Sequence, residues 1–78
     1  VPEPHPGAAL ESAEIASRVR AALESLPEQQ RAVIRLRWLD RLSHGEIAAV
    51  LRISVKTSEN HANRAMHRLR DLLAPLRP

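Results

Sequence analysis

Apolar side chains recur at steps of three and four residues along most of the chain, which is the spacing of amphipathic helices. The first stripe includes Val19, Leu23 and Leu26 and stops at Pro27. Because proline is accepted in the first turn of a helix, a second helix is expected to start there and to run to about Asp40. The pattern therefore predicts two consecutive helices with a short connection.

The second of these helices carries apolar residues on two faces. Val33, Leu36 and Leu39 fall on one face. Ile34 and Trp38 fall on another. Trp38 is the only aromatic residue, and one ring cannot form the stacking surface of a protein that binds single-stranded nucleic acid. We therefore expect Trp38 to belong to the core.

A third, short helix is expected to follow Ser43, because Glu46 stands three residues later at the spacing of a capping box. This helix ends near Arg52. After the turn at Ile53–Val55, a longer amphipathic helix continues until Pro75 stops it. The sequence thus predicts an all-α fold of four helices, without strands and without an internal repeat.

The last two helices have the layout of a helix-turn-helix, in which the second helix enters the major groove of DNA. This unit spans approximately residues 43–73. Ala48 is small where the two backbones must approach, and Leu51 and Ile53 are apolar around the turn. These matches favour a DNA-binding helix pair over an ordinary helical hairpin.

Two positions of the helix-turn-helix are unusual. Arg52 stands at the turn, where a left-handed backbone would cost it about 1 kcal/mol. Ser58 stands at a seam position that is normally apolar, and it should weaken packing unless its hydroxyl bonds to the preceding turn. On this basis Ser58→Val is expected to stabilise the fold.

Composition excludes several classes of function. A chain of 78 residues leaves little room for an enclosed active site, and with no Cys it has no disulfide or thiolate zinc site. Two Gly cannot form a glycine-rich phosphate loop, so we expect no enzyme and no cofactor. His61 and His67 are six residues apart, a spacing that does not favour a metal site. The chain has no apolar run long enough to cross a bilayer, so we expect no membrane insertion.

Charge is distributed unevenly along the chain. Residues 1–34 carry three Arg and five Glu, whereas residues 35–78 carry nine basic and four acidic residues. Eleven of the twelve basic residues are Arg, which suits bidentate contacts to phosphate or guanine. The second half of the chain is therefore the candidate surface for a polyanion such as DNA.

The run Leu26–Leu73 resembles region 4 of bacterial sigma factors, especially those of the extracytoplasmic-function group. The resemblance is carried by four motifs: Leu26-Pro27-Glu28, Leu42-Ser43-x-x-Glu46-Ile47-Ala48, Ile53-Ser54-Val55-x-Thr57, and Arg64-Ala65 followed by Leu69-Arg70. The chain departs from the family at Arg52, where Gly is usual, and at Ser58, where Val is usual. It also has Glu59 and His61 where many members carry basic residues.

The resemblance implies that the domain docks on the promoter −35 element and on the flap of the RNA polymerase β subunit, without chemistry of its own. An anti-sigma factor is a further expected partner. The DNA-binding residues implied by position are Lys56, Thr57, Glu59, Asn60, Asn63, Arg64 and Arg68. Their chemistry agrees, since Asn pairs with adenine, Arg with guanine, and Glu accepts from cytosine. Lys56 and Thr57 would meet phosphates, and Arg68 would contact the backbone.

Three segments are expected: a Pro-rich linker or tail at 1–8, the helical domain at 9–74 and a C-terminal tail at 75–78. The expected location is the bacterial cytoplasm, in association with the nucleoid. Two other interpretations remain open. One is a DNA-binding output domain of a LuxR-type response regulator, which shares the Leu-Ser-x-x-Glu-Ile-Ala pattern. The other is a module that mainly binds protein, which exposure of Ile34, Trp38 or Leu73 would favour.

Overall fold

The structure is a computed structural model that describes the backbone of residues 6–76 and the side chains of residues 11–75. Its elements, in chain order, are α1 (Pro6–Glu24), α2 (Glu28–Ile34), the π-helical segment η1 (Arg35–Leu39), α3 (His44–Leu51), α4 (Val55–Leu73) and the 3₁₀ turn η2 (Ala74–Leu76). Within residues 6–76 there is no strand, and the all-α prediction of four helices is confirmed.

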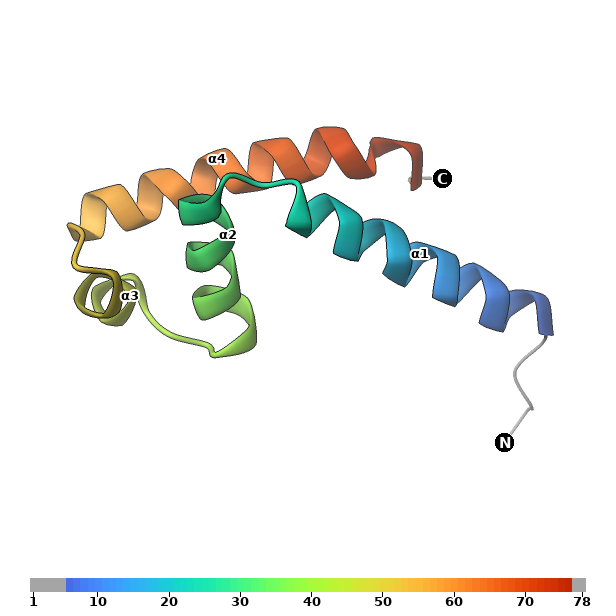
Figure 1. The fold of residues 1–78 in the computed structure, drawn as a ribbon, viewed down its shortest axis with the longest axis horizontal. Coiled ribbons are helices and arrows are strands. Elements are labelled where there is room, and N and C mark those ends of the chain that lie inside the picture. Colours follow the sequence, from blue (N-terminus) through green and yellow to red (C-terminus); the bar gives the residue numbers. More distant parts are fainter. Residues whose placement is uncertain (1–5, 77–78) are drawn as a thin grey trace.

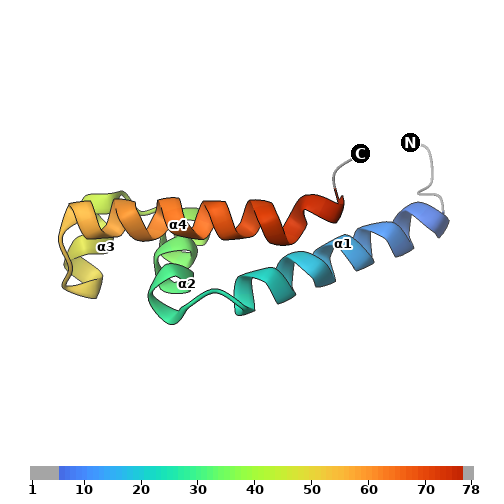
Figure 2. The same cartoon turned by 90° about the horizontal axis from the view of Figure 1, so that it is seen from above.

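Helix α4 is the element against which the other three helices pack. Figure 1 shows α2 and α3 beside the N-terminal half of α4, and α1 beneath its C-terminal half. Seen from above, α1 runs beyond the rest of the fold as a separate arm (Figure 2). The side chains of residues 11–18 on that arm are all exposed. The molecule is therefore elongated, with extents of 46 × 28 × 18 Å.

The core forms where the apolar stripes of α1, α2 and α4 meet. Its main cluster consists of Ala22, Leu26, Ile34, Ala65 and Leu69. Val33 of α2, Ile47 of α3 and Ser58 of α4 are also buried, with no exposed surface. Burial of these side chains, rather than helix propensity alone, holds such short helices together.

Helix α1 begins at Pro6, before the start expected at residue 9. Proline and the residue after it are tolerated there because the first amides of a helix have no partner within the helix. Residues 1–5 of the expected linker, and residues 77–78 of the expected C-terminal tail, lie outside the described residues. The division into linker, domain and tail stays a prediction.

The end of the second predicted helix differs from an α-helix. The amide of Asp40 donates to the carbonyl of Arg35 at 3.3 Å, five residues back, so the last turn is a π-turn. The wider turn changes the register of the side chains that follow it. Trp38 is 48% exposed and Leu39 is 75% exposed. The expectation that Trp38 lies in the core is therefore wrong, and Leu39 is not buried with Val33, which the spacing places on the same face.

The predicted capping box at the start of α3 is confirmed. The amide of Glu46 donates to Ser43 Oγ at 3.1 Å, and the amide of Ser43 donates to Glu46 Oε1 at 3.0 Å. These bonds hold the pKa of Glu46 below its ordinary value of 4.5, with the backbone amide of Ser43 as the largest cause. The start of the helix-turn-helix is thereby fixed locally by two residues.

Candidate nucleic-acid interface

The first turn of α4 is fixed by its own cap. Ser54 Oγ accepts from the amide of Thr57 at 2.9 Å and donates to Thr57 Oγ1 at 2.8 Å. No acidic residue lies in this first turn, so the positive end of the helix dipole is not neutralised from within the turn. Lys56, which lies between the two capping residues in sequence, adds a positive charge. This end of α4 is suited to a phosphate.

The seven residues predicted to bind DNA all lie on α4. Lys56, Asn60 and Asn63 are exposed and recur at steps of three and four residues, so they share one face of the helix. The residues that α4 buries, Ser58 and Leu69 among them, fall on the other side of the helix. The polar face is consequently open while the opposite side is anchored in the fold.

The remaining four predicted residues border this face. Glu59 is exposed beside Asn60, and Arg64 and Arg68 are exposed one turn apart along the flank of α4. Thr57 is half-buried, and its hydroxyl oxygen already accepts a hydrogen bond from Ser54. The hydroxyl hydrogen of Thr57 is still available to a phosphate oxygen.

Ser58 links α4 to α3, a role that sequence reasoning missed. The residue has no exposed surface, and its Oγ lies 2.8 Å from Nδ1 of His44. The expected alternative, a bond to the preceding turn of the same helix, is not the contact that forms. A pair fourteen residues apart carries no local sequence signal. Only the packing of α3 on α4 brings the two side chains together.

Two arginines have left-handed backbones. Arg52, at the turn between α3 and α4, has φ 56° and ψ 47°, the left-handed conformation that was considered for this position. Arg41, just ahead of α3, has φ 57° and was not anticipated, because the capping box identifies where α3 begins but not the backbone conformation before it. Both side chains are exposed.

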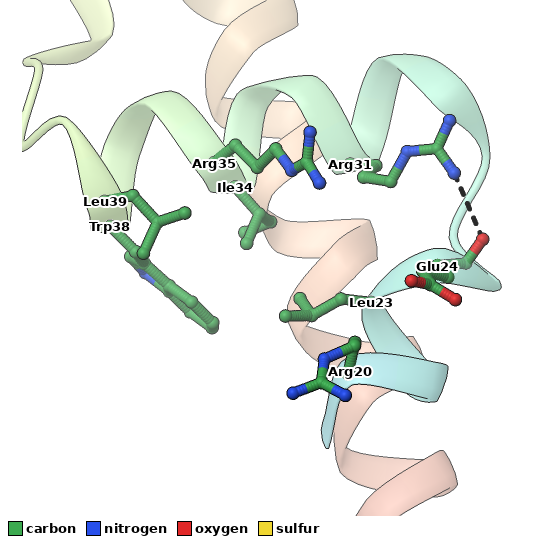
Figure 3. A pocket seen from close by; sticks show the side chains of 8 residues that line it. All are labelled: Arg20, Leu23, Glu24, Arg31, Ile34, Arg35, Trp38 and Leu39. Atoms are coloured by element: carbon green, nitrogen blue, oxygen red, sulfur yellow. Dashed lines mark hydrogen bonds between the residues drawn. The ribbon is translucent and has the colours of Figure 1, made fainter. Parts of the chain in front are cut away.

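A second surface of the domain is apolar. A pocket of about 150 Å³ lies between α1 and the α2–η1 segment, and Figure 3 shows Leu23 and Ile34 among the side chains that line it. The guanidinium of Arg31 borders it and donates to the carbonyl of Glu24 at 3.2 Å. Its lining side chains are Arg20, Leu23, Glu24, Arg31, Ile34, Arg35, Trp38 and Leu39.

An adjoining pocket of about 210 Å³ shares Leu23 and Trp38 with the first and reaches α4 at Met66, Leu69 and Leu73. We call these five residues the apolar groove. Of the residues whose exposure would favour a protein-binding role, Trp38 is half exposed, Leu73 is partly buried and Ile34 is buried. The groove is therefore centred on Trp38 rather than on Ile34.

Comparison with known families shows which family of proteins contains this helix-turn-helix. A family model described as sigma-70, region 4 matches residues 16–69. The chain belongs to the sigma-70 region 4 family. The match covers most of the resemblance found in the sequence and includes the whole of α2, α3 and the predicted DNA-binding residues of α4. Neither of the two open alternatives, a LuxR-type output domain or a module that mainly binds protein, is favoured.

This region 4 domain is also similar to curated sigma factors. It is 33% identical over 72 residues to the ECF RNA polymerase sigma factor SigE of Mycolicibacterium smegmatis, covering 92% of this chain and 28% of that protein. It is 40% identical over 65 residues to the ECF RNA polymerase sigma-E factors of Salmonella typhimurium strain LT2 and Escherichia coli strain K12, covering 83% of this chain and 34% of each. The chain thus spans about a third or less of the length of these relatives.

Two further observations concern residues 6–76 of the region 4 domain. None of the helices in this range combines the length and the apolar character that crossing a bilayer would need. No three His, Asp or Glu side chains of this range gather as a candidate metal site.

Proposed function

We propose that this region 4 domain binds the promoter −35 element by placing the N-terminal half of α4 in the major groove, as part of a sigma factor that directs transcription initiation. The observation that carries the proposal is the polar face of α4. Lys56, Asn60 and Asn63 are exposed on that face, while Ser58 and Ala65 anchor the other side of the helix. A recognition helix needs both properties, an open polar face and a rigid seat.

Each residue has a role that its chemistry supports. The amide groups of Asn60 and Asn63 can pair with adenine, the guanidinium of Arg64 with guanine, and the carboxylate of Glu59 can accept from cytosine N4. Lys56 and Thr57, at the start of α4, contact phosphates. Arg68, further along, contacts the sugar-phosphate backbone and contributes affinity without sequence information. The domain binds and positions, and it carries out no reaction and needs no cofactor.

Charge supports the same assignment. Residues 43–73, which form the helix-turn-helix, carry four Arg and one Lys against two Glu and one Asp. Such an excess attracts DNA over distances comparable to the Debye length and makes affinity fall as salt rises. A domain that binds promoter DNA acts in the bacterial cytoplasm in contact with the nucleoid, and we place it there.

The test is DNA binding by the 78-residue chain, measured by fluorescence anisotropy on duplexes selected from a random pool, at several salt concentrations. Asn60→Ala and Arg64→Ala should each lose about 1–3 kcal/mol of affinity on the selected duplex, and the loss should concentrate at one base pair. Arg18→Ala is the matched control, because Arg18 is exposed on α1 and its ion pair is with Glu14 of the same helix. If the wild-type chain shows no salt-dependent binding to any duplex, the proposal fails.

We also propose that the apolar groove receives a helix of the RNA polymerase β flap, and that an anti-sigma factor competes for it. The half-exposed Trp38 favours this second function, since a large aromatic side chain open to water is a frequent anchor of protein interfaces. Leu23 and Leu73 form the walls beside it. An amphipathic helix laid in such a groove would cover its apolar side chains.

Fluorescence of Trp38, the only tryptophan, reports on this docking directly. Addition of the isolated β flap should shift the emission to shorter wavelength as water leaves the indole ring. Because Trp38→Ala removes the reporter, binding of that variant is measured by calorimetry, where affinity should fall by about 2 kcal/mol or more. Met66→Ala shortens a side chain of the groove that belongs to α4. Because this variant keeps Trp38, its binding to the flap is measured by fluorescence. Unchanged emission at saturating flap, with no heat of binding, would refute the docking proposal.

A further inference from the structure

Arg41 and Arg52 occupy equivalent places ahead of the two helices of the helix-turn-helix. Each stands two residues before an N-cap serine, Ser43 for α3 and Ser54 for α4. Both have left-handed backbones, with φ 57° and φ 56°, and they are the only residues other than glycine with positive φ that the described part of the chain contains. The two turns therefore have the same left-handed residue at the same position, and in each turn that residue is an arginine.

An arginine is a costly residue for this conformation. Its Cβ crowds the following carbonyl oxygen when φ is positive, whereas glycine, which has no Cβ, adopts the same conformation without that penalty. Asparagine also tolerates it better than arginine does. Neither turn carries the residue that would suit its backbone best. A residue held in a strained backbone conformation motivates the hypothesis that its side chain has a function.

Neither guanidinium is used inside the fold. Among the side chains that the structure describes, no hydrogen bond or ion pair involves the guanidinium of Arg41 or that of Arg52, although Arg18, Arg31 and Arg37 each have such a partner. Both arginines are exposed. Their side chains therefore do not compensate for the backbone strain by internal contacts.

We propose that Arg41 and Arg52 are phosphate-binding residues that hold the DNA backbone on both sides of α3. The inference rests on the proposed function and extends it to two residues outside α4. In a helix-turn-helix the first helix crosses the DNA backbone while the second lies in the groove, which puts the ends of α3 near phosphates. The guanidinium group forms bidentate hydrogen bonds with a phosphate, and its charge persists at every physiological pH.

The two roles of each position can be separated by Arg41→Gly and Arg52→Gly, alone and together. Glycine removes the charge and also relieves the left-handed strain. Each variant should therefore melt at a higher temperature than the wild type, by about 4 °C or more for a domain of this size. The same variants should bind DNA more weakly, with the slope of log affinity against log salt reduced by about 0.9 for each phosphate that the variant no longer neutralises.

Two variants serve as controls in the same anisotropy and melting experiments. Arg52→Lys keeps both the charge and the strained backbone, so its salt slope and melting temperature should stay near those of the wild type. Arg18→Gln removes a positive charge from α1, and its salt slope should not change. Selection among bases should be preserved in all the glycine variants, because a phosphate contact carries no sequence information.

The outcomes are distinct. A higher melting temperature with a reduced salt slope supports the inference. A higher melting temperature with an unchanged salt slope overturns the inference. If the wild type binds DNA in that same experiment, the proposed function of α4 still stands. A lower melting temperature in the glycine variants overturns the strain argument and the inference with it. If the wild type does not bind DNA, the proposed function fails, and the inference about Arg41 and Arg52 fails with it.

Discussion

A single buried hydroxyl group connects α3 to α4. Ser58 has no exposed surface, and its Oγ is bonded to His44 Nδ1 of the neighbouring helix. A polar group in such a place is stabilising only while its hydrogen bond exists, since a buried group without a partner loses its hydration and gains nothing. Ser58 therefore does not simply leave a gap in the seam.

The hydrogen bond reverses the effect expected for Ser58→Val. Valine is larger than serine and would deprive His44 Nδ1 of its partner, so both overpacking and the absence of the bond act against the fold. We predict a loss of about 1–3 kcal/mol in the free energy of unfolding, measured by urea denaturation. Ser58→Ala removes the hydroxyl without adding volume and separates the two causes. A variant Ser58→Val that is more stable than the wild type would contradict the role of this bond.

The end of the second helix is a feature that hydrophobic periodicity did not predict. The spacing of Leu36 and Leu39 fits an α-helix, and on that spacing the helix would continue to Asp40. The structure inserts a π-turn instead, and the guanidinium of Arg37 donates to the carbonyl of Leu42 at 3.3 Å across the following loop. A hydrogen bond five residues back arises from how the chain turns toward α3, and a hydrophobic pattern carries no information about that turn.

Helix α1 consists of two unequal parts. Its last turns place Ala22 in the core, with Leu26 just beyond the helix also buried, while residues 11–18 are exposed and their ion pair, Arg18 with Glu14, is a surface one. Surface pairs of this kind contribute little to stability. The family match also begins within α1, at residue 16. The outer part of α1 thus contributes little to the stability of the fold.

Deletion of residues 1–14 should therefore leave the cooperative thermal transition within a few degrees of that of the full chain. Far-ultraviolet circular dichroism should show less helix, because part of α1 is gone, but the same midpoint. Leu26→Ala is the contrasting variant, since Leu26 is 3% exposed and its truncation should cost about 2–5 kcal/mol. Loss of the transition after the deletion would show that the arm contributes to the core after all.

Helix α4 contributes to two separate surfaces of the molecule. Lys56, Asn60 and Asn63 line the open face of α4, whereas Leu69 and Leu73 join α1 and η1 at the apolar groove. The elongated shape of the fold, 46 Å in its longest dimension, keeps the start of α4 far from its end. DNA at one end of the helix therefore leaves room for a protein partner at the other.

The helices, the capping box at Ser43 and the polar face of α4 could be predicted from the sequence, because these depend on residues three or four positions apart. The sequence also marked Arg52 as the turn position where a left-handed backbone would be costly, and the structure has that backbone. The hydrogen bond between Ser58 and His44 and the exposure of Trp38 could not be predicted in this way. Both depend on how helices distant in sequence are placed against one another, and that placement follows from the burial of the whole core rather than from any local pattern.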